Sequence, residues 1–281
     1  MDERTKKQLI IGLIFILIVG GIGYGFVDYF FLVEPTCFDS VQNGVEEGVD
    51  CGTLACGVAC EPAIMPLNIL SQKLIQVRPG DYDFVAQINN PNTLYGASRV
   101  RYTLDLGGML LDKSGTFYIL PGQTRFVIVS GIRSDSVLRE ASFDVTEAEW
   151  EKVETFENIS FPLQRKSYTV ADRNGVLPGE GPVLEPGLRS EFEAVVFNSS
   201  DFDFDKAEVG VILFDEGNNI IAVNRTDIRT FLSRTERHFK VSWPVKLPET
   251  ARQDVEVLTN VFENSNFIKR YGTQEKFQKY Y

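Results

Sequence analysis

Two stretches decide the fold class: DFVAQINN at Asp83–Asn90 and EFEAVVFN at Glu191–Asn198. They are spaced by about 108 residues and share a phenylalanine, an alanine and a final asparagine at matching places. Within each stretch, the residues at alternate positions are apolar. A period of two is typical of a β-strand that turns one face to a core and the other outward. The chain therefore predicts two related β units.

Further blocks repeat in the same order. VRYTLDL at Val100–Leu106 matches VGVILFD at Val209–Asp215, and YILPGQTRFVIV at Tyr118–Val129 matches TFLSRTERHFKV at Thr230–Val241. Glycine and proline pairs between the blocks are turn signals. Several blocks in one order indicate an internal duplication of a strand-rich unit.

Units of about 100 residues with short strands favour tandem immunoglobulin-like β-sandwiches in a mainly β chain. We place the first sandwich at residues 61–155 and the second at residues 156–267. The Cys…Trp…Cys hallmark of antibody domains is missing. Each unit has three strand patterns in the same order. The first ends in Asn-Asn or Asn-Ser, the second reads V-x-V-x-L-x-D, and the third is rich in T-R-F. This order resembles the FxLYD-type bacterial sandwich domains, which implies the same fold.

Some segments depart from the strand pattern. Thr146-Glu147-Ala148-Glu149 has the form of a capping box and predicts a short helix over TEAEWEKV. Residues 159–169 predict the first strand of the second sandwich, and a Gly/Pro-rich loop follows at residues 174–187. The polar tail at residues 268–281 is expected to fray.

Ahead of these units lies the apolar stretch LIIGLIFILIVGGIGYGFVDYFFL at Leu9–Leu32. Leu9–Val27 carries no charge and as a helix covers roughly 28 Å, close to the ~30 Å of a bilayer core. Three basic residues precede it, and the next one is Lys73. The positive-inside rule then places residues 1–8 in the cytoplasm and the remainder on the outer side of the cell membrane, extracellular or periplasmic.

A cleaved signal peptide is the alternative to a membrane anchor. Its apolar core would be shorter and would end in small residues. Residues 9–32 instead end in aromatic residues typical of a membrane interface, including Tyr29, Phe30 and Phe31. We therefore interpret the stretch as an uncleaved, single-pass signal anchor that contacts the lipid bilayer. Gly21 and Gly25 have the GxxxG spacing of packed helices.

Residues 33–60 form a cysteine-rich module. Its four cysteines predict two disulfides, because the segment lies on the oxidising side of a membrane and is too short to bury a core of its own. Three pairings are open. Zinc is the other interpretation, but the spacings lack a CxxC pair. The cysteines are Cys37, Cys51, Cys56 and Cys60.

Four oxygen-bearing side chains are spaced along the same module, Asp39, Asn43, Glu46 and Asp50. Carboxylates and amides are the ligands that calcium takes, so these residues are a candidate calcium site. The alternative is that they form turns, as Asp and Asn do beside glycines. No other cofactor is indicated by the sequence.

The spacing of the module resembles a small unit of prokaryotic surface proteins with the pattern C-x-D-x-x-x-N-x-x-E-x-G-x-D-C-G. The resemblance implies an exposed spacer without catalysis. Thr53-Leu54-Ala55 departs from the usual form, which continues with a second glycine. Together with the anchor and the sandwiches, the module makes the chain resemble single-pass surface proteins of small-genome bacteria.

Chemistry-bearing residues elsewhere are few. His238 is the single histidine and lies in a predicted strand, where we expect an ordinary surface residue. The run Asp201, Asp203 and Asp205 lacks the glycine and glutamate of an EF-hand, so we expect outward acids on a strand edge. Asn-x-Ser/Thr triplets suggest exposed sites at three positions. These are Asn158, Asn198 and Asn224.

These observations predict a membrane-anchored, non-catalytic protein whose sandwiches bind a protein partner on the outer side or build envelope structure. The net charge of −11 argues against nucleic acid as a partner. One alternative is an accessory subunit assembled through the Gly-rich membrane helix. Another is a carboxylate-dependent envelope hydrolase, which would need a cleft with two carboxylates about 5–10 Å apart.

Overall fold

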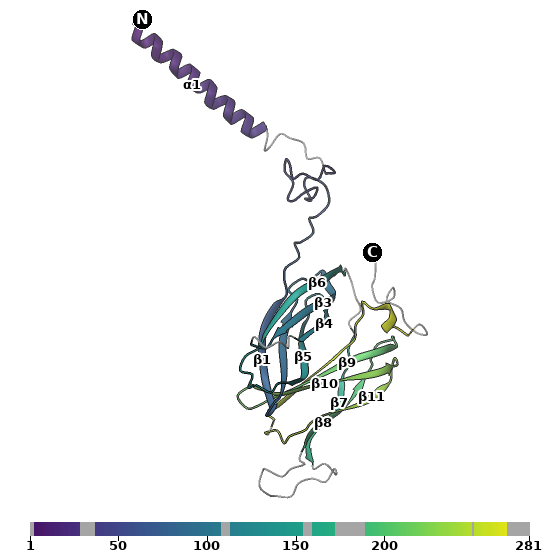
Figure 1. Ribbon diagram of the computed structural model, residues 1–281. Helices are drawn as coiled ribbons and strands as arrows, with labels where there is room; N and C mark the ends of the chain where they lie inside the picture. The colour runs from purple at the N-terminus through teal and green to yellow at the C-terminus, as the bar shows by residue number, and fades with distance from the viewer. Residues whose placement is uncertain are drawn as a thin grey trace. The chain divides into compact units, whose positions relative to one another are not determined.

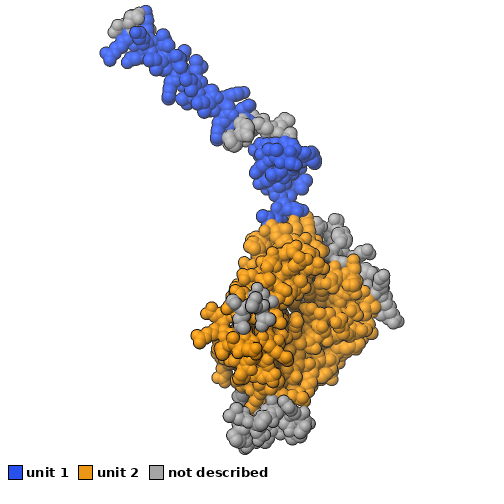
Figure 2. Space-filling model, viewed as in Figure 1, with its two compact units in different colours: residues 1–63 blue, residues 64–281 orange. Residues whose placement is uncertain are grey.

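The computed structural model describes residues 3–28, 37–107, 113–153, 159–171, 189–248 and 250–268. The chain divides into two compact units, residues 1–63 and residues 64–281 (Figure 2). Five predictions fall at least partly outside the described residues. They are the aromatic end of the membrane span at residues 29–32, the domain boundary at 155–156, the triplet at Asn158, the loop at 174–187 and the tail beyond 268.

Helix α1 (Glu3–Val27) coincides with most of the predicted membrane span (Figure 1). The most apolar window within Arg4–Val27 has a mean hydropathy of 2.5, and none of it is buried inside the protein. Ile16 and Leu17, for example, are 69% and 67% exposed. A helix that is apolar all round and has no buried face is not the core helix of a soluble domain. Its length and composition suit a membrane anchor or a signal sequence.

The first six strands form a β-sandwich of two three-stranded antiparallel sheets. One sheet has the order β1-β2-β5 and the other the order β4-β3-β6. The strands are β1 (Asn68–Arg78), β2 (Asp81–Asn89), β3 (Tyr95–Asp105), β4 (Lys113–Ile119), β5 (Thr124–Arg133) and β6 (Ser142–Lys152).

The next six strands repeat this arrangement in a second sandwich, with the sheet orders β7-β8-β11 and β10-β9-β12. Each strand takes the sheet position of the strand six places earlier, so the mainly β, double-sandwich prediction is confirmed. The strands are β7 (Leu163–Ala171), β8 (Arg189–Phe197), β9 (Phe204–Phe214), β10 (Ile220–Phe231), β11 (Glu236–Trp243) and β12 (Arg252–Leu258).

Each sandwich has its own apolar core, and the repeated stretches run through the centre of each. Phe84 on β2 and Phe192 on β8 are both fully buried. Phe84 lies opposite Val129 of β5, and Phe192 lies opposite Val241 of β11. The two phenylalanines therefore occupy corresponding places, as the sequence alignment predicts.

Asn90 ends the first repeated stretch and is fully buried. Its Nδ2 donates to the carbonyl of Tyr95, which begins β3, at 2.7 Å and to that of Leu120, just after β4, at 2.9 Å. Its Oδ1 accepts the N–H of Asn92 at 3.0 Å. A single side chain thus ties the end of β2 to the opposite sheet, and its own buried polar atoms are hydrogen-bonded in turn.

Asn198 makes the corresponding contacts in the second sandwich and is also fully buried. Its Nδ2 donates to the carbonyls of Phe202 and Phe231, at 2.8 and 3.1 Å, and its Oδ1 accepts the N–H of Ser200 at 3.1 Å. The prediction of an exposed glycosylation triplet at Asn198 is therefore wrong. Asn224 is half-buried and donates to the Ser242 carbonyl, and Asn158 lies outside the described residues.

The predicted helix at Thr146 is also wrong, because TEAEWEKV lies mainly in strand β6. The capping-box residues pair with β3 instead. Glu147 lies opposite Arg101 and Val145 opposite Tyr102, so Thr146 is an extra residue in the strand, a β-bulge. The bulge shifts the alternation of buried residues by one place, and pairing with β3 overrides the local helix signal.

The two sandwiches pack against each other through the faces predicted to point outward. Val85 of β2 is 1% exposed and Ile212 of β9 is fully buried, although both occupy positions outside their own cores. They belong to a third apolar cluster that joins sheet β1-β2-β5 to sheet β10-β9-β12. Its buried members are Ile75, Val85, Ile128, Ile212, Phe214 and Val223. The central strands β2 and β9 are consequently buried on both faces.

A second apolar contact comes from the segment after β12. Phe262 packs with Tyr118 and Val153 of the first sandwich. A Cβ on Gly96 would lie 2.6 Å from Cζ of Phe262, so only glycine leaves room for the ring there. A short 3-10 turn, η2 (Asn264–Asn266), then brings Phe267 back into the core of the second sandwich.

Replacing Asn90 by alanine should lower the free energy of unfolding by about 2–4 kcal/mol, because alanine cannot make the hydrogen bonds that the fully buried Asn90 side chain makes to Tyr95, Leu120 and Asn92. Urea unfolding of the full-length protein in detergent, followed by tryptophan fluorescence, measures this. Asn89→Ala is the matched control, since among the described residues the Asn89 side chain bonds only the exposed Thr124 hydroxyl, at 2.9 Å. Equal effects of the two changes would contradict the role of Asn90 between the sheets.

Candidate functional site

The cysteine module contains two disulfides, Cys37–Cys56 and Cys51–Cys60. The first cysteine pairs with the third and the second with the fourth, a choice that the sequence left open. No free thiol is found among the described residues. The bridges close overlapping loops with sequence separations of 19 and 9 residues, which holds together a segment that has no apolar core of its own.

The four candidate calcium ligands form hydrogen bonds within the module. Asp50 accepts the backbone N–H of Asp39 at 3.1 Å and that of Ser40 at 2.9 Å. Glu46 accepts the N–H of Asn43 at 3.0 Å, and Asn43 Nδ2 donates to Asp39 at 3.0 Å. These carboxylates thus fold the loop by accepting backbone donors, which is the turn-forming alternative.

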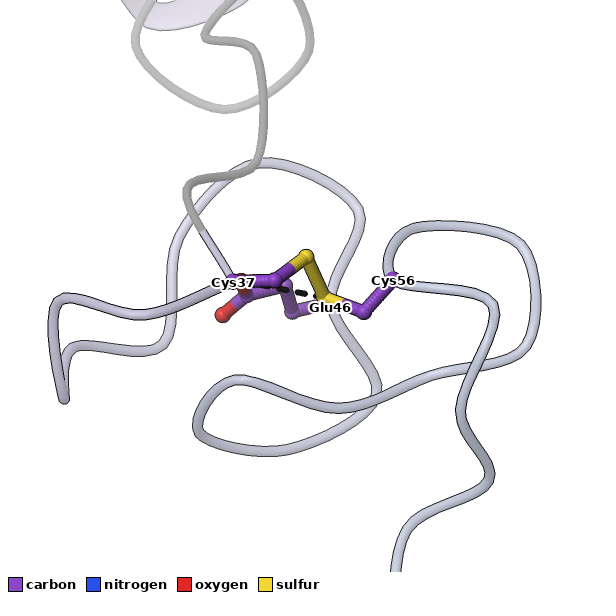
Figure 3. A group of neighbouring side chains, drawn as sticks. All are labelled: Cys37, Glu46 and Cys56. Atoms are coloured by element: carbon purple, nitrogen blue, oxygen red, sulfur yellow. Dashed lines mark hydrogen bonds between the residues drawn. A yellow bond between two sulfur atoms is a disulfide. The ribbon is translucent and has the colours of Figure 1, made fainter.

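One cluster of three potential metal-binding side chains occurs among the described residues: Cys37, Glu46 and Cys56 (Figure 3). Glu46 is 8% exposed, and its Oε1 lies 3.5 Å from Sγ of Cys56. Both sulfurs are joined in a disulfide. Because a metal binds the thiolate form of cysteine, this cluster offers one carboxylate and no sulfur ligand.

Two glycines of the module stand where a side chain would not fit. A Cβ on Gly48 would lie 2.8 Å from Sγ of Cys51 and 3.1 Å from Sγ of Cys60. Gly52 has a φ of +132°, and a Cβ there would meet the backbone nitrogen of Glu47 at 2.9 Å. The spacing of acids, glycines and cysteines therefore encodes a compact fold of the loop.

The acidic run of the second sandwich differs from its prediction at one position. Asp201 and Asp205 are exposed, and Asp201 pairs with Arg234 at 2.7 Å. Asp203, predicted to point outward, is fully buried, and its Oδ1 accepts the N–H of Ser233 at 2.6 Å. A buried carboxylate that holds a loop cannot be exchanged without cost, so the prediction of three tolerant surface acids is wrong for Asp203.

His238 lies on strand β11, and its side chain is 56% exposed. Its Nε2 is 3.3 Å from Glu193 on the neighbouring strand. Lys240 and Glu191 form the next cross-strand ion pair on the same face. The histidine is thus one member of a ladder of polar side chains on a surface sheet, as expected for an ordinary strand residue.

A cleft of about 570 Å³ lies between the two sandwiches. We call it the inter-sandwich cleft. Strands β4 and β5 of the first sandwich line one side, and β9, β10 and β12 of the second line the other. Its charged lining residues are Arg125, Lys206, Glu208, Arg225, Asp227, Arg229 and Glu256. Pockets of this kind occur preferentially at domain interfaces.

Strand register explains why these charges share one face. Asp227 of β10 lies opposite Glu208 of β9, and Arg229 lies opposite Lys206. On the other side of β9, Glu256 of β12 lies opposite Gly210. Residues two apart on a strand point the same way, so the charged positions of all three strands face the first sandwich. Gly210 allows close approach, since Ile128 Cδ1 lies 3.3 Å from where its Cβ would be.

Arg125 of β5 is the central cation of the cleft and is only 5% exposed. Its Nη1 donates to the Tyr118 carbonyl at 2.6 Å, and its Nη2 to Glu208 at 3.4 Å. The guanidinium carbon lies 4.7 Å from the centre of the Tyr118 ring. One side chain thereby connects strand β5, strand β4 and the second sandwich through charge-assisted and cation–π contacts.

Two glutamates in the cleft have pKa values displaced in opposite directions. Burial raises the pKa of Glu256 to about 7, although its carboxylate accepts the N–H of Phe126 at 2.9 Å and lies near Arg125. For Glu208, burial opposes ionisation, but Lys206 at 2.9 Å and Arg125 outweigh it and lower the pKa. Glu256 is therefore largely neutral in slightly acidic solution while Glu208 stays ionised.

Sequence reasoning missed this cleft. Its residues belong to strand faces that the period-two pattern assigned to solvent. These faces carry both apolar and charged residues, such as Ile212 and Glu208 on β9. A fully exposed strand face rarely carries a large apolar side chain among charged ones, so this mixture could have indicated that the faces are partly buried.

No protein-family model matches the chain, and no curated protein matches it in sequence. The resemblances noted for the module and the sandwiches therefore stay predictions.

Gly48→Ala should prevent closure of the Cys51–Cys60 disulfide, because the added methyl group would overlap both sulfurs. Non-reducing mass spectrometry after thiol alkylation should find Cys51 and Cys60 alkylated, with Cys37–Cys56 retained. Leu54→Ala is the control, because the Leu54 side chain is 91% exposed. Full oxidation of the Gly48→Ala variant would refute the packing argument.

Glu256→Gln should stabilise the protein above neutral pH. The folded-state pKa of Glu256 is raised above its ordinary value of 4.5, so its contribution to stability is complete below pH 4.5 and is lost as pH rises through about 7. The melting temperature of wild type, relative to Glu256→Gln, should fall between pH 5 and pH 8.

Glu208→Gln is the opposite control. Its lowered pKa means that ionised Glu208 stabilises the protein above the ordinary pKa, and that this contribution is lost as pH falls. The variant should melt below wild type at neutral pH, with the difference shrinking in acid. Parallel pH profiles for wild type and both variants would contradict the assignment.

Proposed function

We propose that this protein is held in a membrane by helix α1 and presents its disulfide module and sandwiches on the outer side. There they bind a protein partner or build envelope structure without catalysis. The observation that carries the proposal is helix α1 itself, whose apolar side chains are exposed all round. Each large aliphatic side chain gains about 1.5–3 kcal/mol on leaving water, so a bilayer is the natural surrounding for the helix.

Two further observations support the orientation. Arg4, Lys6 and Lys7 precede the apolar segment, which favours a cytoplasmic N-terminus. The two disulfides on the other side of the segment suit an oxidising compartment. A cleaved signal peptide would give the same compartment, but it would release the sandwiches from the membrane.

A protein partner is supported by the surface at the start of the second compact unit. Ile64, Met65 and the first residues of β1 leave large apolar side chains exposed, with Ile69 at 42% and Leu70 at 56%. Strand β1 is also an edge strand, paired only with β2. An edge strand with neighbouring exposed apolar groups is the surface on which another protein adds a strand or packs side chains.

The non-catalytic part of the proposal is supported by the state of the carboxylates in the inter-sandwich cleft. Glu208 and Glu256 lie on one face of neighbouring strands, which is the kind of arrangement that the hydrolase alternative requires. Glu208, however, is engaged by Lys206 and Arg125, and Glu256 by the Phe126 N–H. Both groups thus serve to hold the two sandwiches together.

Membrane-impermeant amine labelling tests the topology. On intact cells, or on spheroplasts where an outer membrane exists, Lys73 and later lysines should react, whereas Lys6 and Lys7 should react only after permeabilisation. The membrane fraction should keep the chain through alkaline carbonate extraction, with Lys6 and Lys7 still attached. Labelling of Lys6 and Lys7 alone would reverse the orientation, and loss of the N-terminal peptide from mature protein would favour a cleaved signal.

A further inference from the structure

The inter-sandwich cleft is a preformed space. Apolar contacts join the sandwiches beside it, the cluster around Val85 and Ile212 and the contact of Phe262 with Tyr118. Its volume of about 570 Å³ lies within the range of roughly 300–1,000 Å³ typical of small-molecule sites. A hollow of about 380 Å³ continues from it and shares Thr116, Phe117, Lys206, Glu208 and Arg229 as lining residues.

The charge of the cleft contrasts with that of the whole protein. The chain has a net charge of −11. The cleft is lined by four cations, Arg125, Lys206, Arg225 and Arg229, against the three carboxylates of Glu208, Asp227 and Glu256. When Glu256 is neutral, four cations face two ionised carboxylates. A cationic recess in an acidic protein attracts anions.

The cations of the cleft are not saturated by protein groups. Among the described residues, the Arg225 guanidinium has no hydrogen bond or ion pair. Arg229 reaches Asp205 and Asp227 only at 3.7 and 3.9 Å. Arg125, although buried, has an Nε without a partner among those residues. Three guanidinium groups therefore line one recess with unused donor capacity.

We propose that the inter-sandwich cleft binds a small ligand through an oxyanion, a carboxylate or phosphate group, held between Arg225 and Arg229 of β10 and Arg125 of β5. The planar guanidinium fork matches the two oxygens of such a group, which lysine cannot do as well. This inference goes beyond membrane display and holds whether helix α1 is an anchor or a signal sequence.

Binding should weaken as pH rises, because an ionised Glu256 repels an anion. The other charged groups that face this region are Arg125 of β5, Lys206 and Glu208 of β9, Arg225, Asp227 and Arg229 of β10, and Asp254 of β12. Burial raises the pKa values of the tyrosines Tyr102 and Tyr118. The pKa of Glu256 is raised to about 7, so the change in its charge is the one that the pH dependence follows.

Inorganic phosphate and malonate are the two probes, titrated calorimetrically into the full-length protein in a non-ionic detergent at pH 6. Sodium chloride keeps the ionic strength constant. At least one probe should bind saturably, and the arm that binds identifies the group as phosphate or carboxylate.

Arg225→Gln/Arg229→Gln should weaken binding at least tenfold. If malonate binds, its affinity should fall severalfold from pH 6 to pH 8 in wild type but not in Glu256→Gln.

Arg165→Gln is the matched control, since Arg165 is an exposed strand arginine, paired with Glu236 on the far sheet of the second sandwich. It should bind as wild type does. Should the double variant melt earlier than wild type, Arg225→Gln alone carries the test, because the Arg225 side chain has no hydrogen bond or ion pair to lose among the described residues. Absence of saturable binding of both probes, or equal loss in Arg165→Gln, would overturn the proposal.

Discussion

Burial of strands β2 and β9 on both faces is the constraint on which the structure of residues 64–268 depends. One face of each strand fills its own sandwich, and the other meets the partner sandwich through Val85 and Ile212. Antiparallel sheets commonly leave one face to water. Here that face is used to join two sandwiches with the same strand order, so the four sheets pack together (Figure 1).

The polar part of the junction follows from the same constraint. Where side chains between the two inner sheets are apolar, the sheets pack closely. Where they are charged, each group needs a partner or water, which keeps a space open. Arg125 forms hydrogen bonds to both the Tyr118 carbonyl and Glu208. Burial raises the pKa of Glu256, so this carboxyl group keeps its proton to a higher pH. The cleft is thus the region that apolar packing leaves unfilled.

Whether a structural feature could be predicted from the sequence depends on how far apart in the chain the residues that determine it lie. Alternation within a strand is local, so Phe84, Phe192 and the repeated strand order could be predicted. The bulge at Thr146, the buried Asp203 and the pairing of Cys37 with Cys56 depend on segments distant in sequence, and local patterns misjudged them or left them open. In the module, the sequence places the acids in one short segment, but their bonds to backbone amides show only in three dimensions.

The contact of Phe262 with the first sandwich makes the packing of that sandwich depend on the order of synthesis. A chain leaves the ribosome from its N-terminal end, and its domains generally fold in that order. Tyr118 and Val153 of the first sandwich nevertheless pack against the ring of Phe262. This residue lies over one hundred positions later in the chain, after the last strand of the second sandwich. The first sandwich is therefore completed by nearly the last part of the described chain to arrive. Until Phe262 has been made, the apolar surfaces of Tyr118 and Val153 that its ring covers lack this contact, so the first sandwich reaches its final packing only after the second has been synthesised.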